Sequence, residues 1–495
     1  MSRINSTYGF LPFRFLRQGK ETLLVNDVGE YYFLKNQAFD LFVNHELETR
    51  SVEFQDLKAK GFVYDGYLPQ TIDLLATKYR TKKRFLYDFT SLHMFVVTRR
   101  CNQKCAYCHA SSIQEDAGDI HDMNYVTARK CVEIAFRSPS SCIKIEFQGG
   151  EPLLNFNVVK EIVEYAEELN ESANKKLEFV ICTNLVALNE KYLEYMESKD
   201  IMVSTSLDGP QHIHDACRKL RLGGGSYDIV TSHLSWAMER LGRDKISALM
   251  TVTLHSVGRL PEVIDEYIKQ ELGSIFIRAM NPFGSAFRNW PRVGCTLDEF
   301  LKGYRQAFDY IIQLNVQGTH FPEVFAALLL TRILTPFSTG FVDLQSPTGA
   351  GISGVIYDVN GDVYVSDEAR MLSRTTGDKT FCIGNVHSDS WNDVFCSHQL
   401  RKIISASCIE AMPGCAWCVF QPYCGADPVR NHFAHVTGQL SNGHREFCHM
   451  NRSLFNLLFD YLSLKNDEIE DVFWSWITHR TLDEIRDYST NIGVA

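Results

Sequence analysis

The sequence predicts an α/β protein built around an open partial barrel of six β/α units. Six β-rich runs are each followed by a helical stretch, at residues 95–98, 143–147, 177–182, 201–206, 246–253 and 274–278. Strict alternation of this kind implies a parallel sheet with right-handed crossovers. Six units are too few for a closed eight-stranded barrel, so we expect an open one with its active site at the carboxyl ends of the strands.

Composition restricts the class of protein. Hydrophobic residues make up 45% of the 495 residues and charged residues 22%, which is typical of a folded globular chain. The net charge of −10 argues against nucleic acid or an anionic membrane as the main partner. The longest aliphatic run, residues 324–330, is far shorter than the ~20 residues that a membrane span needs. We expect a cytoplasmic protein, in which the 15 cysteines are reduced thiols rather than disulfides.

Residues 1–78 read as a separate module. β-rich runs at residues 13–16, 22–25 and 31–34 precede two short helical stretches, which is the pattern of a sheet plus winged helix. The alternative is an irregular N-terminal extension packed on the next domain.

The rest of the chain divides into four parts. We expect the partial barrel at 79–296, a helical linker at 297–340, a cysteine-rich domain of short strands at 341–455 and a helical tail at 456–495.

A three-cysteine loop follows the first barrel strand directly. Cys101, Cys105 and Cys108 have the spacing C-x3-C-x2-C, which can hold three irons of a 4Fe-4S cubane and leave the fourth iron open. Zinc is the rival interpretation, but structural zinc wants four ligands and the adjacent His109 is sterically poor as the fourth. Tyr107 would supply a flat apolar surface suited to stacking an adenine.

A second group of cysteines lies near the C-terminus, at Cys415, Cys418, Cys424 and Cys448. Four ligands make a closed site, so a second 4Fe-4S cluster or a structural zinc would satisfy it. Cys382 and Cys408 are left over. Each could substitute as a ligand, although inert thiols are the simpler interpretation.

The first cysteine loop resembles the signature of the radical S-adenosylmethionine (SAM) enzymes, and the six-unit barrel is the fold that this resemblance implies. In that family the open iron chelates SAM, and an electron from the reduced cluster cleaves it to a 5′-deoxyadenosyl radical. The resemblance also implies SAM contacts at the ends of the second, third and fourth strands, although each segment alone could be an ordinary turn. These positions are Gly149, Gly150, Glu151, Thr183, Asn184, Ser206, Asp208 and, farther along, Arg218.

The second group of cysteines resembles the SPASM-type cluster domain of peptide-modifying radical enzymes, which favours iron–sulfur over zinc. The complete form of that domain holds one more cluster. Here Ser366 stands where one of its cysteines belongs and Pro428 where another does, so we expect that cluster to be missing. In formylglycine-forming relatives the aspartate matching Asp367 accepts a substrate proton, a role that Asp367 could share. A turn aspartate is the alternative.

A wider resemblance covers most of the chain. Residues 11–15, 76–83, 147–151 and 422–428 are similar to the B-type maturase of the His-Xaa-Ser peptide systems. That family implies a small precursor peptide as substrate, a second radical SAM maturase as partner and a reductant such as flavodoxin or ferredoxin. The N-terminal module is similar to peptide-leader recognition modules, in which the leader adds as an edge strand, here near residues 22–34.

Three functional hypotheses follow. The first is a radical SAM enzyme that abstracts hydrogen from a residue of a ribosomally made peptide, which is then oxidised or crosslinked. The second is a sulfatase-type maturase that forms formylglycine, which the missing cluster disfavours. The third is a noncatalytic, metal-stapled scaffold, which would have no use for a cluster with an open iron.

Overall fold

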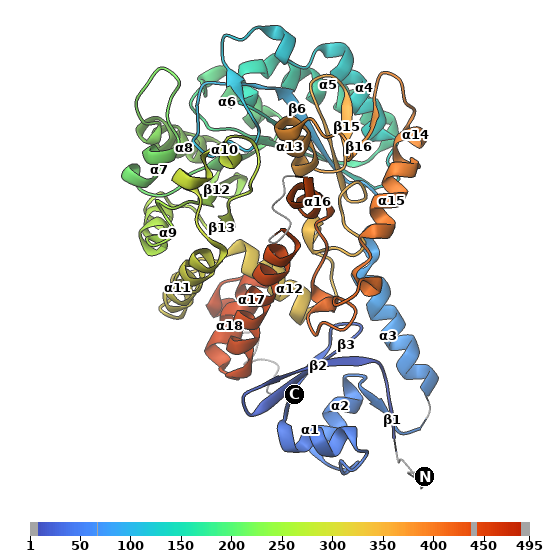
Figure 1. The fold of residues 1–495 in the computed structure, drawn as a ribbon. Helices are drawn as coiled ribbons and strands as arrows, with labels where there is room; N and C mark the ends of the chain where they lie inside the picture. The colour runs from blue at the N-terminus through green and yellow to red at the C-terminus, as the bar shows by residue number, and fades with distance from the viewer. Residues whose placement is uncertain (1–7, 67, 437–442, 487–495) are drawn as a thin grey trace.

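The protein consists of a large barrel-like part, drawn at the top of Figure 1, and a small N-terminal module at the bottom. The computed structural model describes residues 8–66, 68–436 and 443–486. The long helix α3 (Leu68–Lys82) connects the two parts (Figure 1). The C-terminal helices α17 (Gly443–Ser463) and α18 (Asp467–Thr478) lie between them.

All six predicted barrel strands are confirmed. They are β6 (Leu92–Thr98), β9 (Cys142–Gly149), β10 (Lys176–Cys182), β11 (Met202–Ser206), β12 (Ile246–Val252) and β13 (Phe276–Ala279). Each pairs in parallel with the next, in the order β6-β9-β10-β11-β12-β13. All the carboxyl ends of these strands therefore meet at one rim.

The crossover helices cover the outer face of this sheet. They are α4 (Tyr125–Phe136), α5 (Phe156–Ala173), α6 (Glu190–Ser198), α7 (Gln211–Cys217), α8 (Tyr227–Leu241) and α9 (Leu260–Lys269). In α5 the residues Val159, Ile162, Val163 and Ala166 are fully buried, at the 3–4-residue spacing of a helix with one apolar face. Burial of that face against the sheet fixes the helix in place.

The sheet does not end where the barrel was expected to end. β14 (Gly354–Tyr357) pairs in parallel with β6, and β15 (Asp362–Tyr364) and β16 (Cys382–Asn385) continue in antiparallel fashion, giving nine strands in one sheet. The cysteine-rich part is thus joined to the barrel by main-chain hydrogen bonds. Just before the two strands begin, Thr90 N donates to Ile352 O, a residue 262 positions farther along the chain.

Helices supply the remaining architecture. The predicted helical stretch at 297–340 contains α11 (Leu297–Val316) and α12 (Val324–Leu334), preceded by α10 (Gly284–Val293). Two expected domain boundaries fall inside helices, since α3 runs past residue 78 and α17 past residue 455. The others are α13 (Asp367–Thr376), α14 (Trp391–Phe395), α15 (His398–Ala406), α16 (Pro428–Val436), α17 (Gly443–Ser463) and α18 (Asp467–Thr478).

The N-terminal module has its own apolar core. Its three-stranded sheet has the order β2 (Phe13–Gln18), β3 (Glu21–Asn26), β4 (Tyr31–Lys35), and α1 (Asn36–Val43) and α2 (Val52–Ala59) follow. A short pair, β1 (Gly9–Phe10) with β5 (Val63–Tyr64), closes it. The buried cluster includes Leu24, Phe42, Phe54 and Phe62.

The structure corrects the expected edge of this module. β3 pairs with a strand on each side, so residues 22–26 cannot accept an added strand, and the edges are β2 and β4. Tyr31 of β4 packs its ring 5.3 Å from Phe459 of α17, which fixes the module against the C-terminal helices. No helix in the described part of the chain is long and apolar enough to cross a membrane.

Candidate active site

The three-cysteine loop, residues 101–108 (the cluster loop), lies at the carboxyl end of β6. Two short strands, β7 (Arg100–Cys101) and β8 (Ile113–Gln114), pair across its base. Backbone bonds from Lys104 N to Lys219 O and from Ala106 N to Cys217 O, each 2.9 Å, hold it against the segment after α7. Hydrogen bonds within the chain therefore fix the conformation of the cluster loop.

The three thiols are close enough to influence one another. Burial, and then the neighbouring Cys105, raises the pKa of Cys101, and Cys108 adds to that rise. Burial raises the pKa of Cys105 to about 12 although Arg218 opposes it. Three thiols this close on one loop suit a cationic group that binds all of them as thiolates.

Two buried side-chain nitrogens, one in the cluster loop and one directly after it, lack a hydrogen-bond partner among the described residues. Gln103 Nε2 and His109 Nε2 are buried without a hydrogen-bond partner among the described residues. Among all the residues that the structure describes, no three Cys, His, Asp or Glu side chains converge on one point as a single metal ion requires. A cubane binds each thiolate at a different iron, so the residues fit a 4Fe-4S cluster.

Gly149 and Gly150 are glycines because β6 passes beside them. A Cβ atom at Gly149 would lie 2.1 Å from Thr98 O, and one at Gly150 would lie 2.2 Å from Arg100 O. Glycine at these positions lets the end of β9 cross the end of β6 closely, as bonds of 2.8 Å from Gly150 N and Glu151 N to these two carbonyls show. The family resemblance implies a SAM contact at these two glycines, and the structure adds a packing reason for their small size.

Glu151 ties the second strand end to the third. Its fully buried carboxylate accepts hydrogen bonds from Thr183 Oγ1 at 2.6 Å and from Asn184 N at 2.7 Å. Burial raises its pKa to about 7, although these bonds oppose the rise. The Asn184 amide in turn donates to Asn102 Oδ1 at 2.8 Å and to Cys101 Sγ at 3.7 Å. The expected SAM contacts Glu151, Thr183 and Asn184 thus form one network that ends on the cluster loop.

Tyr107, Asp208 and Arg218 form a second network under the loop. Both Tyr107 Oη and Arg218 Nε donate to Asp208 Oδ2, the latter at 3.0 Å. The Arg218 guanidinium lies 5.2 Å from the centre of the Tyr107 ring, which is 3% exposed. The aromatic face that we expected to stack on an adenine therefore packs on Arg218. Ser206 lies at the last position of β11, paired with Leu249.

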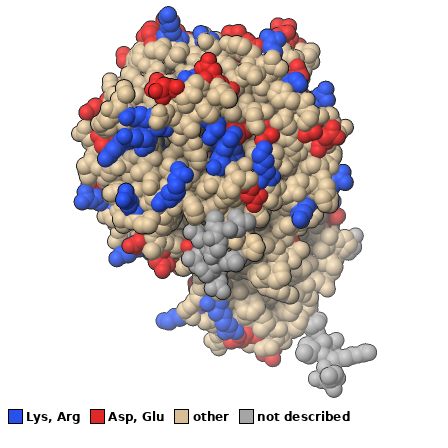
Figure 2. Space-filling model, turned by 45° about the horizontal axis from the view of Figure 1, so that its top comes forward, with Lys and Arg blue, Asp and Glu red and all other residues tan. Residues whose placement is uncertain are grey.

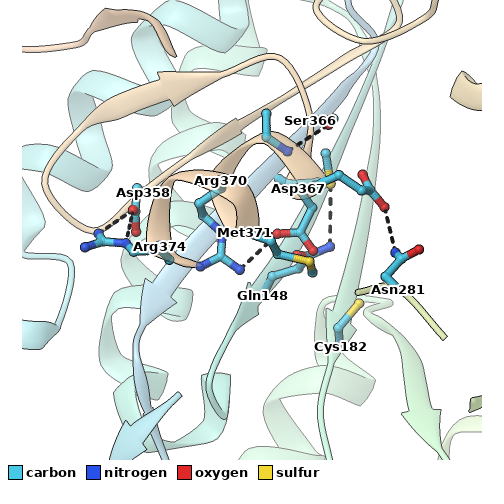
Figure 3. Close-up of polar contacts among 12 residues, drawn as sticks. Gln148, Cys182, Asn281, Asp358, Ser366, Asp367, Arg370, Met371 and Arg374 are labelled. Carbon is cyan, nitrogen blue, oxygen red and sulfur yellow. Dashed lines mark hydrogen bonds and ion pairs between the residues drawn. The ribbon is translucent and has the colours of Figure 1, made fainter. Parts of the chain in front are cut away.

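Asp367 lines a cavity of about 330 Å³, together with Gln148 near the end of β9 and Arg278 near the end of β13. Ser366 accepts a hydrogen bond from Ala369 N and so caps α13, which makes Asp367 the first residue of that helix. Figure 3 shows Asp367 turned toward Arg370, whose Nε and Nη2 donate to it at 3.1 and 2.9 Å. Burial raises the pKa of Asp367, although the charge of Arg370 opposes this rise.

The cavity contains charged residues that the sequence analysis did not single out. Glu368 accepts from Arg278 at 3.3 Å and from Asn281 at 3.4 Å, joining α13 to the end of β13. Burial, and then the charge of Asp427, raises the pKa of Asp343 to about 8. The position of Arg278 at a strand end was the one signal in the sequence that could have identified it.

The fold brings the second group of cysteines close together. These auxiliary cysteines are Cys415, Cys418, Cys424 and Cys448. The pKa of Cys415 is raised by burial and then by the charges of Cys448 and Cys418. Burial raises the pKa of Cys424 to about 12, and Cys418 and Cys415 add to that rise. Asn451 Nδ2 also donates to Cys424 Sγ at 3.8 Å. The four thiols are thus neighbours, as a shared cluster needs.

Cys382 and Cys408 stand apart from both groups. The Cys382 thiol donates to Gly384 O at 3.5 Å, and the Cys408 thiol donates to Ile404 O at 3.5 Å. The charged neighbours that shift their pKa values are Asp362 and Lys379 for the first and Glu410 and Lys83 for the second.

Comparison with known proteins gives this site a family. Residues 95–266 match the model of the Radical SAM superfamily. The chain is 22% identical over 354 residues to a cysteine-type anaerobic sulfatase-maturating enzyme of Clostridium novyi, covering 69% of this chain and 88% of that protein. It is 37% identical over 127 residues to an uncharacterized protein of Methanocaldococcus jannaschii, covering 26% of this chain and 41% of that protein.

A solved structure shares the fold. It is anSMEcpe with bound AdoMet and the Cp18Cys peptide, which superimposes with a TM-score of 0.63 at 18% identity over 76% of this chain and 99% of that one. At this identity the likeness concerns the fold alone. The strand order, the cluster loop and the family match agree, and residues 95–266 of this chain are therefore a radical SAM domain.

Proposed function

We propose that this protein is a radical SAM enzyme that removes a hydrogen atom from a residue of a small precursor peptide, which is then oxidised or crosslinked. The observation that carries the proposal is that the cluster loop is joined to the helix that begins in a cavity of about 330 Å³. Ser285 N donates to Cys108 O and the adjacent Gly284 N donates to Thr375 Oγ1 of α13, each at 2.8 Å, and α13 begins at the cavity residue Asp367. A scaffold would need the cysteines but not the cavity beside them.

Bound at the cluster loop, a 4Fe-4S cluster and SAM would supply a 5′-deoxyadenosyl radical that takes a hydrogen atom from the substrate. Cys101, Cys105 and Cys108 would hold the cluster. The Glu151 network orients the end of the third strand toward it. The auxiliary cysteines would hold a second 4Fe-4S cluster, which would accept the electron that the substrate radical loses on oxidation.

Asp367 is the proton acceptor in this proposal. The substrate radical loses one electron and one proton on oxidation, and a carboxylate in the cavity wall can take that proton. Arg370, which is 1% exposed, holds Asp367 Oδ1 by two hydrogen bonds and leaves Oδ2 for the substrate.

The N-terminal module would bind the leader of the peptide. A cavity of about 500 Å³ lies between the start of β2 and α3, lined by Leu11 and Arg14 on one side and by Ile72 and Tyr79 on the other. A leader strand could pair there with the free edge of β2, deriving affinity from main-chain bonds. The relative that was solved with a peptide supports a peptide substrate.

The test is anaerobic incubation of the reconstituted enzyme with SAM, a reductant and the peptide encoded beside its gene. We expect 5′-deoxyadenosine and a peptide of changed mass. Ile72→Glu should weaken binding of a labelled peptide, whereas Val52→Glu, on an exposed site of the same module, should not. Formation of deoxyadenosine without any change in the mass of the peptide would refute the proposal that this peptide is the substrate.

The likeness to sulfatase-maturating enzymes favours one second candidate, oxidation of a cysteine or serine to formylglycine. A hydrazide probe separates the two, because only formylglycine carries an aldehyde. The His-Xaa-Ser subfamily and a second radical SAM maturase as partner remain predictions, which copurification with the neighbouring gene products would test.

A further inference from the structure

The cluster loop is enclosed by surface segments of unusual charge. Residues 99–114 contain the loop, residues 216–227 lie against it through the bond from Lys104 N to Lys219 O, and residues 279–297 carry α10. α10 packs directly on the loop, since Asn289 Nδ2 donates to Ala106 O at 2.8 Å and Ser285 N donates to Cys108 O at 2.8 Å.

These three segments contain eight basic residues and no acidic one, in a chain whose net charge is −10. The basic residues are Arg99, Arg100, Lys104, Arg218, Lys219, Arg221, Arg288 and Arg292. Figure 2, in which the top of the molecule is turned forward, shows many lysine and arginine side chains on that face, with some aspartate and glutamate side chains among them. A local excess of one sign against an opposite net charge needs a reason beyond solubility.

Four of the eight basic side chains are exposed and form no ion pair with a described residue. Arg100 pairs with Asp122, Arg218 pairs with Asp208, and Arg221 donates to Cys101 O at 2.7 Å. By contrast Lys104, Lys219, Arg288 and Arg292 are exposed and make no ion pair with any described residue. We call these four the rim cations.

Exposed apolar side chains accompany the rim cations. Leu222 is fully exposed in the loop after Arg221, and Trp290 is 37% exposed between Arg288 and Arg292. Apolar contacts surrounded by unpaired charges of one sign are typical of a surface that binds a partner of the opposite sign.

We propose that the rim cations form the docking surface for a small acidic electron-carrier protein. The inference rests on the proposed function in one respect, that a cluster in this loop must receive an electron, and not on the peptide substrate. At each encounter the carrier is oxidised by one electron and the cluster is reduced by one. Lys104, between Cys101 and Cys105, places a carrier at this surface next to the thiolates.

Charge complementarity of this kind acts mainly on the rate of encounter. Steering by opposite charges raises association rates by roughly 10- to 1,000-fold, and salt screens it. The rim cations should therefore matter for a protein donor and not for dithionite, whose small anion can reach the cluster by other routes.

The test compares two triple charge reversals in the reconstituted full-length protein. The first is Lys219→Glu with Arg288→Glu and Arg292→Glu. The control is Arg401→Glu with Lys402→Glu and Lys465→Glu, three exposed cations on α15 and after α17 that make no ion pair with any described residue. Both variants change the net charge equally, so a difference between them reports position.

Flavodoxin is the probe, in a binding titration and as the hydroquinone donor for deoxyadenosine formation. We expect the rim variant to bind flavodoxin at least about tenfold more weakly at low salt, with the difference shrinking at high salt. Its donor-dependent rate should fall similarly, while its rate with dithionite stays within about twofold of the parent.

Equal flavodoxin binding by the rim and control variants would overturn the proposal. Loss of precursor-peptide binding with unchanged flavodoxin binding would also overturn it and would make the surface a peptide site. The binding titration tests the docking surface even if the parent protein fails to cleave SAM. Such a failure would contradict the proposed function and leave the test of the surface valid.

Discussion

Replacing Asp367 by asparagine should separate peptide modification from SAM cleavage. Asparagine keeps the size of the side chain and an oxygen that can accept the bonds from Arg370 Nε and Nη2, now 3.1 and 2.9 Å long. It cannot accept a proton. A positioned base contributes about 10²- to 10⁴-fold, so the rate of modification should fall by at least roughly 100-fold.

The structural cost of this change can be bounded. Arg370 is 1% exposed, and losing the charge of its partner leaves Asp358 as its next acidic neighbour. Removing one partner of a buried pair costs about 3–5 kcal/mol, and the cost here should be smaller because both hydrogen bonds survive. The folded enzyme should therefore persist and still form deoxyadenosine.

Asp358→Asn is the matched control. Asp358 is fully buried and accepts from Arg374 Nε at 3.0 Å. Figure 3 shows Arg374 on the helix that also carries Asp367 and Arg370. Asp358 does not line the cavity. Peptide mass and deoxyadenosine would be followed by chromatography, with thermal melting for folding. Equal losses of modification in the two variants would refute the role of Asp367.

Four further outcomes are expected. Reconstituted protein should hold about eight irons per chain. Alanine at the three cysteines of the cluster loop should lower this number to about four and abolish deoxyadenosine formation. About twelve irons in the parent would show that the cluster we expect to be missing is present. Alanine at Cys415 and Cys418 should spare some SAM cleavage but end peptide modification, and undiminished modification would remove the auxiliary site from the reaction. Gly150→Ala should weaken folding and stop cleavage, because its Cβ would lie 2.2 Å from Arg100 O, whereas an unchanged melting temperature would contradict this packing argument. His93, fully buried, has its pKa lowered by burial to about 4, so the unfolded chain takes up a proton as pH falls below about 6.5 while the folded chain does not. Stability should fall by about 3 kcal/mol between pH 6.5 and 4, and His93→Gln should flatten this slope in urea titrations.

The barrel was predictable because its signals are local. Each strand is a short apolar run, each crossover helix has one apolar face, and the cluster-loop spacing of Cys101, Cys105 and Cys108 is complete within eight residues. The position of Asp367 after Ser366 was also readable, and the structure adds that Ser366 caps the helix that begins there.

Other features could not be read because they join distant segments. The pairing of β14 with β6 extends the barrel sheet into the cysteine-rich part, a contact between segments more than 250 residues apart that no local pattern indicates. The edge of the N-terminal sheet depended on knowing that β3 lies in the middle. Strand order is set by which apolar faces bury one another, and no short stretch of sequence contains that information.

The sequence alone determined the six strands, their order along the chain and the spacing of the cysteines that we propose hold iron, because apolar periodicity and ligand spacing are properties of short segments. Only the tertiary structure decided what surrounds those cysteines. Tyr107 meets Arg218 from 111 residues away, Arg278 meets Glu368 from 90 residues away, and the rim cations converge from three segments. Such contacts follow from packing of the whole chain, since their energies depend on burial and distance rather than on sequence separation.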